Sequence, residues 1–98
     1  MKHFAWNAEK NEQLKAQRGV SFEEIVFHIE NGDLLDEVDH PNFAKYPYQK
    51  MYVVRISDYA FLVPFVKAGD EIFLKTIIPN RKATKMYIGD EDEKDKTG

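Results

Sequence analysis

Three apolar runs separated by short turns constrain the fold of this chain more than any other feature. The runs occupy residues 49–57, 59–66 and 71–78. They are rich in β-branched and aromatic residues, which favour strands, and Ser57-Asp58 and Ala68-Gly69-Asp70 separate them by hairpin-sized turns. Pro64 cannot donate a hydrogen bond to a neighbouring strand, which predicts a bulge or an unpaired edge at that position. The sequence therefore predicts an antiparallel meander.

Two helices are expected before the meander, because capping residues mark their ends. Asn7 is a good N-cap for a helix that runs to Arg18, and Gly19 suits the position just after a helix end. Ser21 and Glu24 have the spacing of a capping box at the start of the second helix. The apolar residues of this second helix recur at helical spacing on one face, namely Phe22, Ile25, Val26 and Ile29.

The remaining elements complete an α+β pattern. His3–Trp6 and Leu34–Asp39 are expected strands, and Arg81–Ile88 is an expected short C-terminal helix. Helices must bury their apolar sides against a sheet. The predicted fold class is therefore α+β, with an antiparallel meander sheet of four to five strands covered by two N-terminal helices. The expected core includes Phe22, Ile25, Val26, Ile29, Val53, Leu62, Ile72, Leu74 and Ile77.

One domain and a tail account for the chain. Residues 1–89 are expected to form a single domain. Residues 90–98 carry five acids, two lysines and no apolar residue, which predicts an acidic disordered tail. The formal charge of −3 resides in this tail, so residues 1–89 are formally neutral. That balance excludes a strongly basic nucleic-acid binder but is compatible with a local basic site.

Composition disfavours several other chemistries. The 98 residues include no cysteine, so the chain has no disulfide, thiolate metal site or cysteine nucleophile. The three histidines lack metal-ligand spacing, and the scattered glycines form no phosphate-binding loop. No apolar run approaches the ~18 residues of a membrane span, and the N-terminus lacks the apolar stretch of a signal peptide. We therefore expect a cytoplasmic protein without a metal or cofactor.

Charge is unevenly distributed along the domain. Seven acids and no Lys or Arg lie between Glu23 and Asp39, whereas residues 72–89 hold four bases and no acid. These bases are Lys75, Arg81, Lys82 and Lys85. Such a cluster suits a phosphate, and the alternative interpretation is a solvated surface helix.

A second basic set lies near the N-terminus. It consists of Lys10, Lys15 and Arg18, preceded by Trp6. Lys10 and Arg18 are about two helical turns apart on one face. A single tryptophan most often fills a core, and it is also suited to stacking on a nucleic-acid base.

Three segments in order resemble one known family. They are Phe4–Asn11, Gly19–Glu24 and Ile77–Thr84. The first has a Lys shortly after a Trp-Asn pair, the second reads Gly-Val-Ser-Phe-Glu-Glu, and the third contains Arg-Lys-Ala-Thr after an expected strand. This ordered set, spread over nearly all of the expected domain, resembles the BrnT-like toxins of bacterial type II toxin–antitoxin systems.

The resemblance implies a RelE-like fold and a metal-independent endoribonuclease that cleaves messenger RNA. It also implies a cognate antitoxin, commonly with a ribbon-helix-helix DNA-binding part, that neutralises the toxin and represses the shared operon. The family often has His where this chain has Arg18, and an acid where it has Tyr87. The residues carried over by position are Trp6, Lys10, Arg81 and Lys82.

Metal-free RNA cleavage uses the adjacent 2′-hydroxyl as nucleophile and needs a base, an acid and cations around the phosphorane. The planar fork of Arg suits the phosphorane, so Arg81 is the expected catalytic cation, supplemented by Lys82 or Lys75. The expected substrate-binding residues are Trp6, Lys10, Arg18 and Lys85. The general base stays open among Lys10, His40, Glu9 and Tyr87.

Two functions of different class follow from this pattern. The first is a toxin ribonuclease that is paired with an antitoxin. The second is a non-catalytic subunit, a degenerate toxin that docks a DNA-binding antitoxin and takes part in operon autoregulation. The segment Arg81–Thr84 favours the first, and Arg18 in the place of the family's His favours the second.

Overall fold

The computed structural model describes residues 3–39, 44–45 and 49–89. In chain order its elements are β1 (His3–Trp6), α1 (Ala8–Arg18), α2 (Phe22–Glu30), β2 (Leu34–Asp39), β3 (Gln49–Ile56), β4 (Tyr59–Ala68), β5 (Glu71–Leu74), β6 (Ile78–Pro79) and α3 (Arg81–Tyr87). These elements confirm the α+β class. No helix among the described residues has the length and apolar character needed to cross a membrane. The expected tail, residues 90–98, lies outside the described residues.

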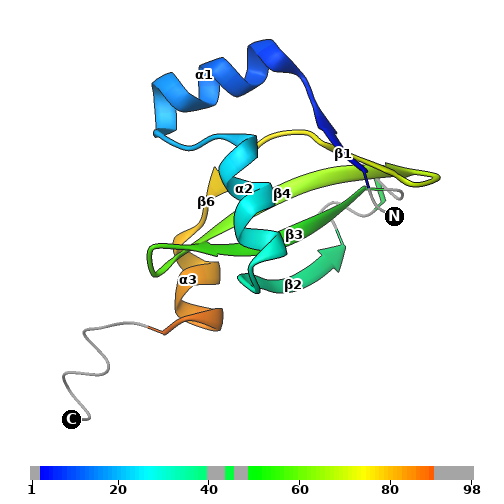
Figure 1. Cartoon of the computed structure of the whole chain (residues 1–98). Coiled ribbons are helices and arrows are strands. Elements are labelled where there is room, and N and C mark those ends of the chain that lie inside the picture. Colours follow the sequence, from blue (N-terminus) through cyan, green and yellow to red (C-terminus); the bar gives the residue numbers. More distant parts are fainter. Residues whose placement is uncertain (1–2, 40–43, 46–48, 90–98) are drawn as a thin grey trace, which may run out of the picture.

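The strands form one mixed sheet in the order β1-β5-β4-β3-β2, and β6 also pairs with β4 (Figure 1). Strands β3, β4 and β5 are antiparallel neighbours, which confirms the meander. The expectation of a purely antiparallel sheet of four to five strands is wrong, because β1 runs parallel to β5 and β6 adds a sixth strand. A parallel pair needs a long connection. The chain between Asn7 and Asp70 is long enough to provide this connection. The sequence does not predict the direction of β1, because a strand of four residues has no pattern that fixes it.

The turns of the meander follow from their residues. Ser57 and Asp58 both have positive φ, 50° and 65°, as a tight two-residue hairpin turn requires. Asp58 accepts a hydrogen bond from the guanidinium of Arg55 at the end of β3. The next turn contains Gly69 with a φ of 61°, a conformation that costs glycine little.

Strand β3 pairs along one side of β4, and Pro64 lies where the neighbour on the other side of β4 changes from β6 to β5. Strand β4 pairs with β5 through Phe65–Ala68 and with β6 through Phe61 and Leu62. The Pro64 carbonyl accepts from the backbone N–H of Lys75 at 2.8 Å, so its nitrogen faces the same interrupted edge. The expected bulge is absent, because pairing with β3 continues through Pro64 opposite Met51, and the other edge is only partly unpaired there, since the Pro64 carbonyl is hydrogen-bonded while its nitrogen has no hydrogen to donate.

Alternation of side chains divides the core between two faces of the sheet. The first face carries Tyr52, Val54 and Phe65 and is covered by α2. The second face carries Val53 and Ala60 and is covered by α3. The two helices flank the sheet in Figure 1, and α1 contributes the apolar side chain of Leu14 to the core of the first face.

The expected core is only partly correct. Val26, Ile29 and Leu62 are half-buried rather than buried. Val26 and Ile29 pack at the margin of the core of the first face, and Leu62 lies under the short α3 on the second face. The other six expected residues are buried, namely Phe22, Ile25, Val53, Ile72, Leu74 and Ile77.

A buried asparagine joins α1 to α2. Asn11 is 4% exposed, and its Oδ1 accepts from the backbone N–H of Phe22 at 2.8 Å. Its Nδ2 donates to Oε1 of Glu23 at 2.7 Å, which is the first cause of the lowered pKa of that carboxyl. The amide thus satisfies a free N–H in the first turn of α2 and fixes α1 against it.

The capping box of α2 provides a direct stability test. The Ser21 hydroxyl accepts from the backbone N–H of Glu24 at 3.1 Å, and the Glu24 carboxylate accepts from the backbone N–H of Ser21 at 3.2 Å. We expect Ser21→Ala to lower the free energy of unfolding by about 1 kcal/mol, measured by urea denaturation. Ser21→Thr, which keeps a capping hydroxyl, is the control, and equal losses in both variants would contradict the capping role.

Candidate functional site

The bases of residues 72–89 lie on the side of the sheet that carries the second face. The ammonium of Lys75 is 5.5 Å from the centre of the Phe73 ring, and Phe73 alternates with the first-face residues on either side of it. Arg81 and Lys82 are exposed on α3, whose buried Ala83 packs on the second face. The three expected catalytic residues therefore lie on one side of the sheet. Lys85, expected to bind substrate, is exposed on the same helix.

Side chains at its N-terminal end fix α3 to the start of β4. The side-chain Oδ1 of Asn80 accepts from the backbone N–H of Ala83 at 2.7 Å, and the backbone N–H of Asn80 donates to the Ala60 carbonyl at 3.1 Å. The Thr84 hydroxyl accepts from the backbone N–H of Ala60 at 2.9 Å and donates to the Asn80 carbonyl at 2.8 Å. The first turn of α3, which carries Arg81, is thus held to β4 by the hydrogen bonds that Asn80 before it and Thr84 after it make with Ala60.

A tyrosine–carboxylate hydrogen bond fixes the other end of α3. The Tyr87 hydroxyl donates to Oδ2 of Asp36 on β2 at 2.6 Å. This bond is the first cause of a raised pKa of Tyr87 and of a lowered pKa of Asp36. A phenol that already donates its proton to a carboxylate is a poor general base. The geometry therefore gives Tyr87 an anchoring position, and sequence reasoning did not foresee its partner.

Acid should weaken the hydrogen bond between Tyr87 and Asp36. The pKa of Asp36 is lowered from its ordinary value of 3.8, first by the Tyr87 hydroxyl and then by the backbone N–H of Glu37. A depressed carboxyl pKa adds stability that is complete above the unfolded-state pKa and is lost as pH falls through the folded-state pKa. We expect Tyr87→Phe to reduce the loss of stability between about pH 5 and pH 2, measured by urea denaturation across that range. Tyr59→Phe is the control, and an acid-side slope equal to that of the parent in Tyr87→Phe would refute the link.

The remaining expected substrate-binding residues lie on the other side of the sheet. Trp6 is half-buried against the first-face core and stacks on Phe22, with ring centroids 5.7 Å apart. Arg18, at the end of α1, donates to the backbone carbonyl of Ile77 between β5 and β6. Lys10 is half-buried on the same helix. The expected catalytic cations thus lie on one side of the sheet and Trp6 on the other, while Arg18 reaches Ile77, in the segment between Lys75 and Arg81.

The candidates for a general base are also dispersed. Glu9 and Lys10 are on α1, which contacts the core of the first face. Tyr87 is engaged with Asp36. His40 lies outside the described residues. Among the described candidates, no base is placed beside Arg81.

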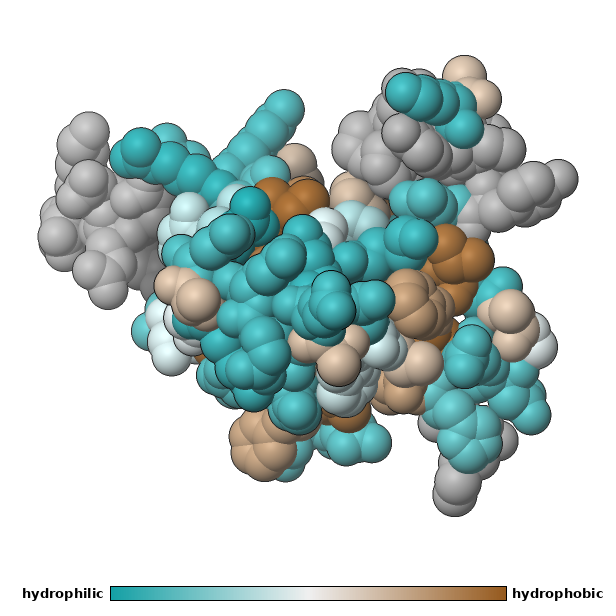
Figure 2. Space-filling view, turned by 90° about the horizontal axis from the view of Figure 1, so that it is seen from above, coloured by the Kyte–Doolittle hydropathy of each residue, from teal (hydrophilic) through white to brown (hydrophobic). Residues whose placement is uncertain are grey.

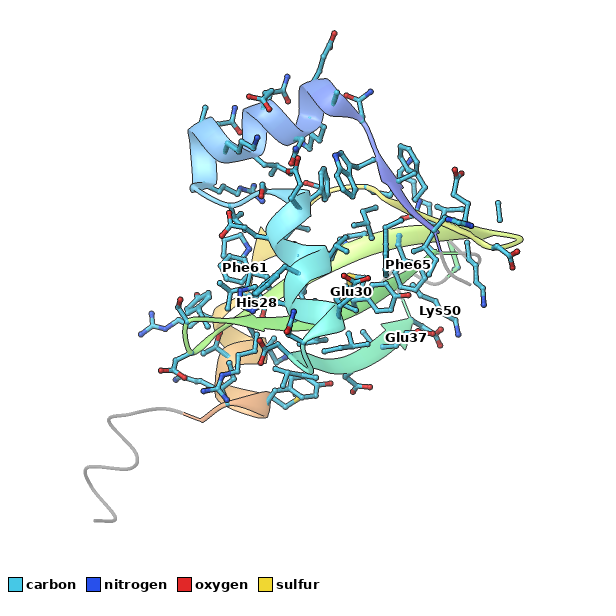
Figure 3. All side chains as sticks on the ribbon, in the orientation of Figure 1. His28, Glu30, Glu37, Lys50, Phe61 and Phe65 are labelled. Atoms are coloured by element: carbon cyan, nitrogen blue, oxygen red, sulfur yellow. The ribbon has the colours of Figure 1, made fainter. Side chains whose placement is uncertain are left out.

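The acidic half of the surface lies on α2 and β2. At the C-terminal end of α2, His28 Nδ1 is 2.7 Å from Oδ2 of Asp33. Glu37 of β2 and Lys50 of β3 point toward each other, with 3.6 Å between the charged atoms (Figure 3). Seen from above, the surface over α1 is largely hydrophilic (Figure 2). The acids between Glu23 and Asp39 therefore lie mainly on α2 and β2, and Asp36 of β2 reaches α3 through Tyr87.

Within residues 3–39, 44–45 and 49–89, no group of three or more His, Cys, Asp or Glu side chains is arranged to hold a metal ion. Comparison of the chain with protein-family models, with curated proteins and with solved structures finds no match. Function must therefore be argued from the residues and their geometry.

Proposed function

We propose that this chain is the toxin component of a type II toxin–antitoxin system and that it cleaves messenger RNA in the cytoplasm without a metal or cofactor. The supporting observation is the set of cations Lys75, Arg81 and Lys82 on one side of the sheet. Neither Arg81 nor Lys82 has an ion-pair partner among the described residues. Unpaired, anchored cations suit a polyanion such as RNA. The RelE-like form of the fold belongs to the same proposal.

In this function Arg81 binds the phosphate at which the RNA is cleaved. Its guanidinium provides two parallel donors for two phosphorane oxygens, and Lys82 and Lys75 add positive charge on the same side of the sheet. The 2′-oxygen of the RNA gives up its proton and bonds to the adjacent phosphorus, the bond between phosphorus and the 5′-oxygen breaks, the 5′-oxygen takes up a proton, and a 2′,3′-cyclic phosphate remains. Lys85 would contact the RNA backbone further along α3. We also propose that the chain pairs with a cognate ribbon-helix-helix antitoxin, which neutralises it.

A non-catalytic subunit is the second candidate function. It is favoured by a specific observation, namely that none of the described base candidates lies beside Arg81. In this role the chain docks its antitoxin and contributes to repression of the operon without cutting RNA.

Expression of the chain without any partner separates the two functions. Growth arrest with loss of intact messenger RNA would support the nuclease. A cleavage assay with purified protein and excess EDTA, scored for 2′,3′-cyclic phosphate ends, tests the metal-free chemistry. Normal growth at high expression, with intact RNA in the assay, would exclude the nuclease and leave the docking subunit.

A further inference from the structure

The outward side of α2 carries one exposed aromatic ring among three carboxylates. Phe27 is 60% exposed. Glu23, Glu24 and Glu30 stand four and three residues before it and three residues after it, so they are its neighbours on the helix surface. All three are exposed, whereas the opposite side of α2 packs in the core. We call Glu23, Glu24, Phe27 and Glu30 the α2 ridge.

Little positive charge compensates the ridge. Glu23 accepts a hydrogen bond from the neutral amide of Asn11, and Glu24 accepts from the backbone N–H of Ser21. Glu30 has no ion-pair partner among the described residues. The ammonium of Lys15 is paired with Glu12 at 3.1 Å, and this hydrogen bond is the first cause of the raised pKa of Lys15, to which Glu23 and Glu24 contribute last. The ridge is thus an acidic surface with an apolar centre.

The geometry points to the α2 ridge as a docking surface for a basic helix of a partner protein, one that places an apolar side chain over Phe27 and Lys or Arg side chains beside the glutamates. At many interfaces a few side chains that become fully buried on binding supply most of the affinity, and aromatic rings are common among them. The surrounding carboxylates steer a basic partner and set its orientation. This inference goes beyond the proposed function, because it requires neither RNA cleavage nor the cations on α3.

A second copy of this chain is the less suitable occupant. Helix α3 does carry the complementary chemistry, since Met86 is 68% exposed beside Lys82 and Lys85. However, α2 and α3 cover opposite faces of the sheet, so an α2–α3 contact between copies is head-to-tail. Such contacts propagate into open chains unless the rotation closes a ring. A separate partner protein can bind the α2 ridge without forming such open chains.

The test uses the full chain and a synthetic probe. The probe is a dye-labelled amphipathic helix with leucines along one stripe flanked by Lys and Arg, and its binding is followed by fluorescence anisotropy. We expect saturable binding that weakens with salt, and Phe27→Ser should raise the Kd by about tenfold. Phe27→Leu should retain most of the affinity. Glu30→Gln should raise the Kd by about twofold at low salt and have no effect at high salt.

Matched controls make the result decisive. Met86→Ser removes an equally exposed apolar side chain from the other face and should leave the Kd unchanged. Thermal unfolding of each variant verifies the fold. Equal binding by Phe27→Ser, or by a probe with serines in place of its leucines, would overturn the proposal. Concentration-dependent self-association of the parent chain that disappears in both Phe27→Ser and Met86→Ser would assign the ridge to a second copy instead.

Discussion

Arg81→Ala should lower the rate of RNA cleavage by about 10²–10³ and abolish growth arrest, the scale of losing one donor to a developing oxyanion. The fold should survive, because Arg81 is exposed and its truncation opens no cavity. Arg81→Lys should lose most of the activity as well, since a point charge does not reproduce bidentate geometry. The measurements are growth after induction and a cleavage time course with purified protein.

Met86→Ala on the same helix is the control for Arg81, because it removes an exposed side chain without changing charge. Lys85→Ala should weaken cleavage much less than Arg81→Ala does. A fully toxic, folded Arg81→Ala variant would mean that the cations on α3 have no part in catalysis. The site would then have to be sought near Trp6, Lys10 and Arg18 on the other side of the sheet.

Phe22→Ala should have the largest effect on stability, about 3–5 kcal/mol in the free energy of unfolding. Phe22 is fully buried, stacks on Trp6 and begins α2 over the first-face core. Against a typical total of about 5–15 kcal/mol, this loss brings a domain of this size close to unfolding. Urea denaturation followed by tryptophan fluorescence measures it directly.

The control for Phe22 lies on the same helix. Phe27→Ala removes an identical ring that is exposed, and it should change the stability by no more than about 0.5 kcal/mol. Similar losses in the two variants would show that burial of the Phe22 ring does not decide the outcome, since the higher helix propensity of Ala favours both variants.

Features set by near neighbours in the chain were predictable. The N-caps Asn7 and Ser21 satisfy N–H groups only three residues away, so the helix starts are visible in the sequence. The turn at Ser57-Asp58 is equally local. Even the interrupted edge at Pro64 follows from one residue that lacks an N–H.

Features set by distant contacts were not predictable. The direction of β1 depends on its pairing with β5, and a four-residue strand fits either direction. The role of Asn11 is not visible in the sequence of α1, because its partner Phe22 belongs to the next helix. Trp6 and Arg81 are separated because α2 and α3 cover opposite faces of the sheet. Which face each helix covers is fixed only once the strands have paired in register.

The parallel pairing of β1 with β5 also sets when the domain can fold. During synthesis β1 leaves the ribosome before the two helices and three strands that separate it in the chain from its neighbour in the sheet, Glu71–Leu74. Long-range pairing of this kind delays folding, because loop closure comes before the contacts that reward it. Until β5 emerges, Phe4 and Trp6 lack the strand that shields them, and a nascent chain stalled before Glu71 displays both to water and to chaperones.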